Sequence, residues 1–295
     1  GSGVYPTYAE CIERCTEIPQ VSFDCLFGTC RDPGDGSGVY PTELACQEAC
    51  VPATSWNCVD CECVSVHGLD GTYPTEVDCL SSCISFITTW LTTSPGQRIF
   101  LPYDILSGTY SGTIDWGDGN TDVNDGTVTS HTYAIAQKYF ISICGDIIGW
   151  NFSSVPNSRN LINSVVQWGN LQLIDGSGYF AGCTNLDLSS VIGTLNLTGI
   201  TSLSSMFNGC SSISTINGIN SWATIAITNM SSMFNSCYIL NSSLAFNTVA
   251  VQNMFSMFKG SNNFNQPLTF NTVAVTNMSS MFQGCLAFQQ NIGSW

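Results

Sequence analysis

Hydrophobic residues recur with a long, regular period from about residue 154 to the end of the chain. The phrases TSLSSMFNGC, TNMSSMFNSC, QNMFSMFKGS and TNMSSMFQGC follow one another, and each contains one phenylalanine at the same place: Phe207, Phe234, Phe258 and Phe282. Phe180 in GYFAGC lies one further repeat upstream. One narrow hydrophobic stripe per repeat cannot be buried within that repeat, so the coils must stack, with strands about 4.8 Å apart. The pattern predicts a solenoid over residues 154–295.

Within one coil the pattern predicts a short helix followed by an extended segment. Met278, Met281 and Phe282 are spaced i, i+3 and i+4, and Asn277 stands at a capping position before them. The stretch PLTFNTVAV supplies the extended part of the coil. The last coil stops where the next strand is expected, so we expect further repeats after Trp295.

Residues 84–153 follow a different pattern, in which short β-rich stretches alternate with turns. Three stretches are each predicted to form strands bounded by turn residues: RIFLPYDI, SGTIDWGDGN and TSHTYAIAQKYFISICGD. This region therefore predicts a β domain between the solenoid and the N-terminal part of the chain.

Residues 1–83 are organised by cysteines rather than by hydrophobic residues. Two sets of four cysteines match one for one at a constant offset: Cys25, Cys30, Cys46 and Cys50, then Cys58, Cys63, Cys79 and Cys83. Cys11 and Cys15 correspond to the second half of an earlier repeat, whose first half is missing. A unit as short as one such repeat buries little hydrophobic surface, whereas each disulfide contributes roughly 2–4 kcal/mol. Disulfides are expected to replace a core here.

Each cysteine repeat contains the phrase Tyr-Pro-Thr, which predicts the start of a short helix. Thr7, Thr42 and Thr75 are good N-cap residues. Cysteines four apart on the helix point the same way and cannot easily bond each other, so both must reach back to the earlier pair. Two of the three possible pairings remain.

The segment YPTELACQEAC faintly resembles the closing helix of Kunitz-type inhibitor domains over about eleven residues. This resemblance implies nested pairing, with Cys25 bonded to Cys50 and Cys30 to Cys46. It does not imply protease inhibition.

Two clusters in this region have metal-binding alternatives. Cys58, Cys61, Cys63 and His67 have spacings that a zinc site uses, but the repeat already assigns two of these cysteines to disulfides. Cys61 is left to pair with Cys144 or with another chain. The turns DPGDG, with Asp32 and Asp35, and HGLDG suit calcium, although Asp-Gly is ordinary turn chemistry. We expect no metal or cofactor, with structural calcium as the alternative.

Charge and cysteine content narrow the class of protein. The net charge is −15, from 6 basic and 21 acidic residues, and this acidity makes nucleic acid an unexpected partner. Sixteen cysteines at regular spacing favour an oxidising, extracellular compartment. No run of about 18 hydrophobic residues is present to span a bilayer. The length of 295 residues suggests two or three domains.

IDWGDG followed by SHTYAIAQKYFISI resembles the signature of PKD-like domains, which are immunoglobulin-type β-sandwiches of surface and secreted proteins. The resemblance implies that Trp116 fills the space between two sheets and that Asp118-Gly119 makes a tight hairpin. His131 and Tyr133 would begin the strand that pairs back, which gives His131 a structural role.

VTNMSSMFQGCLAFQQNIGSW resembles the BspA-like leucine-rich repeats of bacterial surface proteins, an α/β solenoid. The resemblance covers nearly half of the chain. It implies an extracellular protein that adheres to host cells, matrix or other microbes. Related repeats also occur in phage and large-virus proteins.

Two further sets of residues recur in the solenoid. Cysteines occupy the same place in successive coils, with Ser261 in the fourth: Cys183, Cys210, Cys237 and Cys285. A buried column of small side chains is the favoured interpretation, and a metal ladder the alternative.

Five Asn-x-Ser/Thr sites are interpreted first as caps, and glycosylation is left open: Asn151, Asn196, Asn229, Asn241 and Asn277.

The favoured hypothesis is a non-enzymatic, adhesin-like protein of a cell or virion surface. The solenoid would bind an extracellular protein or glycan through its edges of Ser, Thr and Asn residues. Four aromatic residues would contribute to this surface: Trp168, Trp222, Tyr238 and Trp295. Catalysis finds little support, because only two histidines are present and charges are almost absent after residue 160. The alternatives are a structural spacer of a virion fibre or surface appendage, with contacts to other copies, and the accessory region of a secreted hydrolase.

Overall fold

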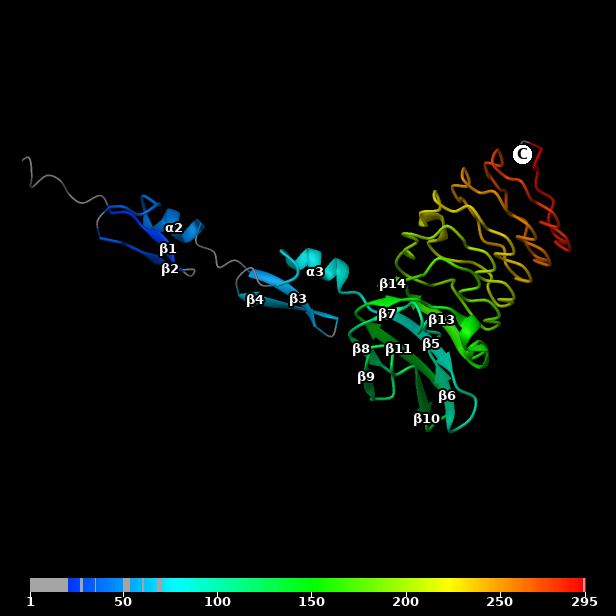
Figure 1. Cartoon of the computed structure of the whole chain (residues 1–295), viewed down its shortest axis with the longest axis horizontal. Coiled ribbons are helices and arrows are strands. Elements are labelled where there is room, and N and C mark those ends of the chain that lie inside the picture. Colours follow the sequence, from blue (N-terminus) through cyan, green and yellow to red (C-terminus); the bar gives the residue numbers. More distant parts are fainter. Residues whose placement is uncertain are drawn as a thin grey trace, which may run out of the picture. The chain divides into compact units, whose positions relative to one another are not determined.

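The computed structural model describes residues 21–26, 29–34, 36–49, 54–59, 61–67, 71–293 and 295. These residues fall into two compact units. The first unit comprises Gly1–Cys58 and Cys63–Cys79, and the second comprises Val59–Glu62 and Leu80–Trp295. Strands predominate in the described residues, and both α-helices belong to the cysteine repeats (Figure 1). No helix among the described residues is long and hydrophobic enough to cross a membrane.

Each of the two described cysteine repeats consists of a hairpin and a helix. The hairpins are β1 (Asp24–Leu26) with β2 (Thr29–Arg31), and β3 (Thr54–Val59) with β4 (Glu62–His67). The helices are α2 (Glu43–Ala49) and α3 (Glu76–Ser82). Isolated bridges at equivalent places of the two repeats add a further segment to each hairpin, Phe23 with Tyr40 and Trp56 with Tyr73.

Threonine caps start both helices, as the Tyr-Pro-Thr phrase predicts. The Thr42 Oγ1 accepts a hydrogen bond from the Ala45 N–H at 3.1 Å, and the Thr75 Oγ1 accepts one from the Asp78 N–H at 3.1 Å. Such caps satisfy an N–H that has no partner within the helix. Thr7, Cys11 and Cys15 lie outside the described residues.

Two disulfides, at equivalent places of the two described repeats, follow the nested arrangement. Cys30 bonds Cys46, and Cys63 bonds Cys79, which is the corresponding pair of the next repeat. Cys46 and Cys79 are fully buried, so the crosslinks lie where a larger domain has its core. Three more cysteines of the two repeats are disulfide-bonded: Cys25, Cys58 and Cys83. Cys50 lies outside the described residues.

The second unit begins with β-sheets. A five-stranded sheet has the order β13-β5-β11-β8-β9. Its strands are Ile162–Gln167, Phe86–Leu91, Lys138–Cys144, Thr113–Asp115 and Thr121–Val123. A two-stranded sheet pairs β10 (Ser130–Tyr133) with β6 (Gln97–Phe100). A three-stranded sheet orders β14 (Leu171–Gln172), β12 (Ile147–Ile148) and β7 (Thr109–Tyr110).

The residues of the PKD-like motif form one packed cluster. Trp116 is fully buried, its indole stacks on His131 with ring centroids 5.0 Å apart, and the Tyr133 hydroxyl donates to the Trp116 carbonyl at 2.9 Å. His131 Nε2 lies 2.8 Å from Asp118 Oδ2. Gly119 turns the chain between β8 and β9 with φ +92°, a conformation that suits glycine. His131 therefore has the expected structural contacts.

Strand β13 connects the β-sheets to the solenoid. It pairs antiparallel with β5, and it forms parallel bridges to the coil that follows, Ser164 with Asp187 and Gln167 with Ile192. One continuous hydrophobic cluster extends from Phe86 to Met281. The predicted boundary between residues 153 and 154 therefore falls inside a shared core.

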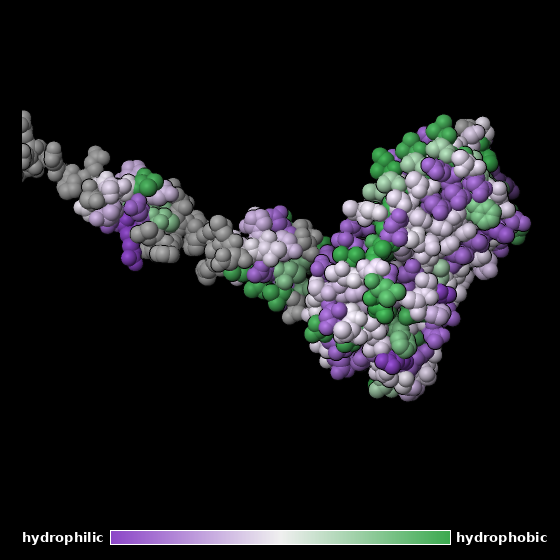
Figure 2. Space-filling model, viewed as in Figure 1, coloured by the Kyte–Doolittle hydropathy of each residue, from purple (hydrophilic) through white to green (hydrophobic). Residues whose placement is uncertain are grey.

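The remaining chain stacks as coils (Figure 1). Parallel bridges connect equivalent residues of successive coils, Ser202 to Asn229, Asn229 to Asn253 and Asn253 to Asn277. The described part of the second unit also contains the 3-10 helices η1 (Phe152–Ser154), η2 (Pro156–Ser158) and η3 (Ile219–Ser221). Figure 2 shows hydrophilic residues over the coils, mixed with scattered hydrophobic ones.

The prediction of a short helix in each coil is wrong. Two consecutive turns occupy that place, closed by hydrogen bonds from the N–H of Met206 to the carbonyl of Leu203 and from Cys210 to Phe207. Alternate N–H groups of this segment donate to the next coil instead, from Ser205 to Ser231, from Phe207 to Met233 and from Gly209 to Asn235, while the Asn208 N–H closes an overlapping turn on the Ser205 carbonyl. A helix would direct every N–H along its own axis, so it could not form this ladder. We call this segment the double turn.

Candidate binding surface

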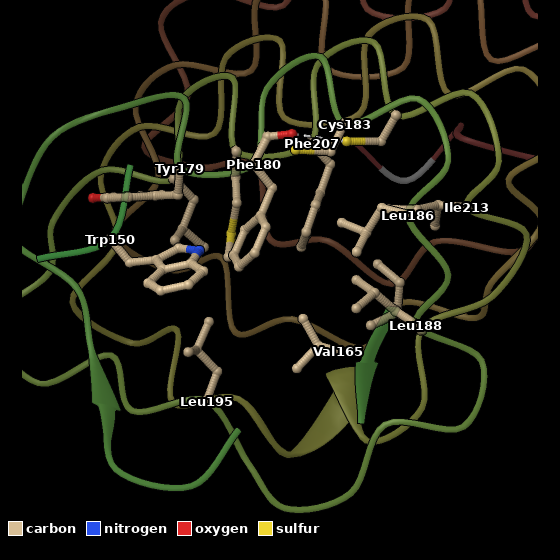
Figure 3. Close-up of a cluster of buried hydrophobic side chains, with 14 of the residues drawn as sticks. Trp150, Val165, Tyr179, Phe180, Cys183, Leu186, Leu188, Leu195, Phe207 and Ile213 are labelled. Carbon is tan, nitrogen blue, oxygen red and sulfur yellow. Dashed lines mark hydrogen bonds between the residues drawn. The ribbon is translucent and has the colours of Figure 1, made fainter. Parts of the chain in front are cut away.

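The inner side of the double turns is a stack of phenylalanine rings. Ring centroids of Phe180, Phe207, Phe234, Phe258 and Phe282 lie 5.7–5.9 Å apart in succession. Figure 3 shows the first two rings of this stack side by side above Val165 and Leu195. The first four rings are fully buried. This stack fixes the register of the coils, so residues at equivalent outward positions are also aligned.

The cysteines of the solenoid form a hydrogen-bonded column beside the rings. The thiols of Cys210, Cys237 and Cys285 donate to the Phe carbonyls of preceding coils at 3.0, 3.1 and 2.7 Å. Ser261 replaces cysteine and donates to the Phe234 carbonyl at 2.6 Å. Burial raises the pKa of Cys210 to about 12 and also raises the pKa of Cys183 and Cys237. These contacts give the column a role in stacking, as the favoured interpretation predicts.

Two positions of every double turn have positive φ. The first is Gly178, Ser205, Ser232, Ser256 or Ser280, and the second is Gly182, Gly209, Ser236, Gly260 or Gly284. The two positive-φ positions are four residues apart. This spacing lets successive N–H groups donate alternately within the turn and to the next coil. Both positions are therefore required by the hydrogen-bond ladder rather than by a ligand.

The asparagines before the double turns cap them. The Oδ1 of Asn229 accepts from the Ser231 N–H at 3.0 Å, and Asn277 accepts from Ser279 at 3.0 Å. Asn151 and Asn196 make the same bond two residues onward. Asn241 accepts instead from the Asn265 N–H of the following coil at 3.1 Å. All five Asn-x-Ser/Thr sites thus have a structural use for their amide oxygen.

The outward side of the double turns forms an aligned, nearly uncharged surface, which we call the turn face. Each coil has two positive-φ positions, and we define the turn face by the single residue directly before each of them. In four coils these residues are Ser204, Asn208, Ser231, Asn235, Phe255, Lys259, Ser279 and Gln283. Backbone bonds between coils set its register, from the N–H of Ser232 to the Phe255 carbonyl and from Ser236 to Lys259. Hydroxyl groups of neighbouring coils meet on this face, with the Oγ atoms of Ser204 and Ser231 2.9 Å apart.

The aromatic residues expected on the solenoid surface are distributed differently. Trp168 and Trp222 are buried, with 0% and 5% of their surface exposed, so their predicted place in a binding surface is wrong. Their indoles contact each other and the phenylalanine stack, with centroids 6.1 Å apart between the two. Tyr238 is 49% exposed, and Trp295 is partly buried against Phe270.

Sequence reasoning missed two residues of the turn face. Phe255 is 42% exposed, and Lys259 is exposed four residues later. Both stand at outward positions where the neighbouring coils have Ser, Asn or Gln. The signal was present in the phrase QNMFSMFKGS, which departs from its neighbours at these two positions. Lys259 is also the single charged residue after Asp187.

A shallow groove lies elsewhere on the solenoid. It has a volume of about 400 Å³ and runs between residues 194–199 and residues 221–226. Its lining is mainly hydrophobic and contains no titratable side chain. Acid–base chemistry therefore has no group to use in this groove.

The cysteines of the candidate zinc site are already engaged in disulfides. Cys61 bonds Cys144, which settles the choice left open for its partner, and Cys58 and Cys63 are also disulfide-bonded. Oxidised cysteines provide no thiolate for zinc. The Asp32 carboxylate accepts from the Gly34 N–H at 2.8 Å, as in an ordinary turn. Asp35 and the segment at 68–70 lie outside the described residues.

The second unit defines a β-rich protein that ends in a repeat array of stacked coils. A family model described as "Mycoplasma protein of unknown function, DUF285" matches residues 151–245 and, in a second overlapping match, residues 201–295. Both matches lie in the part of the chain that contains the coils. No curated protein and no solved structure matches the chain.

Proposed function

We propose that this chain is a non-enzymatic extracellular surface protein that binds a glycan or protein ligand through the turn face of its solenoid. The observation that carries the proposal is the alignment of outward Ser, Asn and Gln side chains from coil to coil, with one charge among them. Such a surface offers many hydrogen-bonding groups in a fixed register. Binding to it needs little electrostatic attraction, so most of the affinity would persist in high salt.

The disulfides support an extracellular location. Three crosslinks are described: two lie within the cysteine repeats, and the third joins Cys61 to Cys144 at the end of β11. The match to a family of repeat proteins supports the use of the coils as a surface module. The resemblance to BspA-like repeats supports adhesion as the activity of that module.

The distribution of titratable groups supports a binding role over catalysis. His131 is occupied by Asp118 and Trp116. The described coils after Asp187 carry no carboxylate and no histidine. General acid–base catalysis needs such groups within reach of a substrate.

Binding of the full chain to arrayed extracellular glycans and matrix proteins tests this proposal. We expect a hit whose affinity changes little between 50 and 500 mM salt. The double variant Ser231→Glu and Ser279→Glu places charges on the turn face and should abolish binding without unfolding the chain. The matched control Ser243→Glu, on another exposed part of the coils, should bind normally.

The spacer function is the alternative outcome of the same experiment. The unbroken stack of rings and the continuous core favour a stiff rod, which a spacer needs. A folded chain that binds no class of extracellular ligand would overturn the binding function and leave the spacer.

A further inference from the structure

The coil that contains Phe255 and Lys259 differs from its neighbours on its outer side. Its double turn reads Met-Phe-Ser-Met-Phe-Lys-Gly-Ser, whereas the next one reads Met-Ser-Ser-Met-Phe-Gln-Gly-Cys. The buried positions Met254, Met257 and Phe258 keep the residue types of the repeat. Two of the three changes are therefore at outward positions, where packing does not require them.

The two outward residues occupy equivalent places in consecutive turns. Phe255 follows Met254 in the turn closed by the Met257 N–H, and Lys259 follows Phe258 in the turn closed by the Ser261 N–H. Because both turns have the same geometry, both side chains project from the turn face. The inter-coil bonds place Ser231 and Ser279 beside Phe255, and Asn235 and Gln283 beside Lys259.

The result is an exposed ring and a lone cation on the same face, four residues apart, among hydroxyl and amide groups. A ring that is 42% exposed has a free face for the C–H groups of a sugar. The Lys259 ammonium has no ion-pair partner among the described residues and meets no competing carboxylate in the described coils after Asp187. A carboxylate on a ligand is its natural complement.

We propose that Phe255 and Lys259 form a subsite for an acidic saccharide, with the ring stacking on the sugar and the ammonium pairing with its carboxylate. This inference rests on the proposed function and names the chemistry of its ligand. The polar side chains on either side donate hydrogen bonds to the sugar hydroxyls and accept hydrogen bonds from them. These side chains are Ser231, Asn235, Ser279 and Gln283.

The repeat itself supplies conservative variants for the test. Lys259→Gln introduces the residue of the next coil, Gln283, and Phe255→Ser introduces that of Ser279, so both variants should keep the fold. Val273→Thr removes an exposed hydrophobic side chain outside the turn face and serves as the matched control.

The experiment titrates the full chain with 3′-sialyllactose and with lactose, which lacks the acidic sugar. We expect the wild-type chain to prefer sialyllactose and to lose part of that preference in 500 mM salt. Lys259→Gln should weaken sialyllactose binding by about three- to fivefold without changing lactose binding, as an exposed ion pair predicts. Phe255→Ser should weaken binding of both sugars by roughly tenfold. Val273→Thr should change neither.

Two results would overturn the subsite. One is equal affinity of the wild-type chain for both sugars, and the other is unchanged sialyllactose binding in Lys259→Gln. If either occurs while the chain still binds another ligand that Ser231→Glu with Ser279→Glu removes, the proposed function stands and the subsite fails. If no ligand binds at all, both fail.

Discussion

Serine takes a backbone conformation in these coils that is usually left to glycine. Five serines have φ between +53° and +60°: Ser205, Ser232, Ser236, Ser256 and Ser280. A non-glycine residue incurs a steric cost there, because its Cβ crowds the backbone. The cost is tolerated because the inter-coil N–H bonds require this geometry. Glycine already fills the same position as Ser236 in other coils, at Gly209, Gly260 and Gly284.

Ser236→Gly should therefore stabilise the second unit. We expect the free energy of unfolding to rise by about 0.5–1 kcal/mol, since relief of strain exceeds the added entropy of the unfolded chain. Chemical denaturation measures the change. Ser243→Gly, at an exposed position without positive φ, should lower stability instead. A loss of stability in both variants would contradict this account of the double turn.

Asp175 ties the first coil to the next. Its carboxylate accepts from the N–H and hydroxyl of Thr201 and from the N–H of Ser202, at 2.8, 2.5 and 2.9 Å. Partial burial raises the pKa of Asp175, but these hydrogen bonds outweigh it and lower the pKa below its ordinary value. The folded state therefore releases this proton more readily than the unfolded chain does.

The sign of the pH dependence follows from that shift. Asp175 stabilises the fold above its unfolded pKa of about 3.9, and this contribution is lost as the pH falls through the lower folded value. We expect unfolding free energies measured between pH 2 and 6 to decrease on acidification. The unfolding free energy of the Asp175→Asn variant should decrease less steeply on acidification than that of the wild-type chain. Parallel curves for the two proteins would contradict this role of Asp175.

At the scale of one coil, the phenylalanine stack buries one large ring against the rings of its neighbours. Phe234 is fully buried, with rings on both sides at 5.8 and 5.7 Å. Phe282 is only partly buried, although it has ring contacts with Phe258, Phe288 and Trp295. The same residue type thus has a different burial in different coils, which the repeat in the sequence does not reveal.

Phe234→Ala should cost about 3–5 kcal/mol of unfolding free energy, because it removes a large buried side chain and leaves a cavity. Phe282→Ala should cost clearly less, because solvent already reaches that ring. Denaturation curves of the two variants provide the comparison. Equal losses would mean that burial along the stack does not set the contribution of each ring.

The double turn shows what the pattern within a coil can and cannot predict. The spacing of Met278, Met281 and Phe282 predicted that all three lie on one side of a compact segment; Met281 and Phe282 pack on the hydrophobic cluster, whereas Met278 is 37% exposed. The spacing did not distinguish a helix from two turns, because both bring residues i, i+3 and i+4 together. The choice was made by N–H groups that bond the neighbouring coil, so their partners lie a full repeat away in the sequence.

At the scale of the whole second unit, one disulfide joins distant parts of the chain. Cys61 and Cys144 are separated by 83 residues, and Cys144 ends β11 in the five-stranded sheet. The hydrophobic cluster of this unit is already continuous without the bond. Its contribution should therefore come mainly from restricting the unfolded chain.

Replacing Cys61 and Cys144 together by alanine should lower the unfolding free energy by roughly 2–4 kcal/mol and leave the ring stack intact. Denaturation followed by near-ultraviolet circular dichroism measures both effects. Cys285→Ser removes a free cysteine but keeps a donor to the Phe258 carbonyl, so it is the control. An unchanged stability of the double variant would show that the crosslink does not restrict unfolding.

The sequence by itself determined the features that repeat. The period of the phenylalanines predicted stacked coils, the constant offset between the two sets of cysteines predicted equivalent modules, and Tyr-Pro-Thr predicted two helix caps. Each of these depends on residue types at fixed spacing, which a linear chain displays directly. The absence of charge after Asp187 apart from Lys259 likewise needed no structure to see.

Only the tertiary structure decided which groups meet across coils and sheets. It buried Trp168 and Trp222, bonded Cys61 to Cys144, and made β13 both a sheet strand and the first rung of the coils. It also aligned Phe255 and Lys259 on one face. The physical reason is that burial and hydrogen bonding of a residue depend on neighbours far away in the sequence, whose positions are set by stacking.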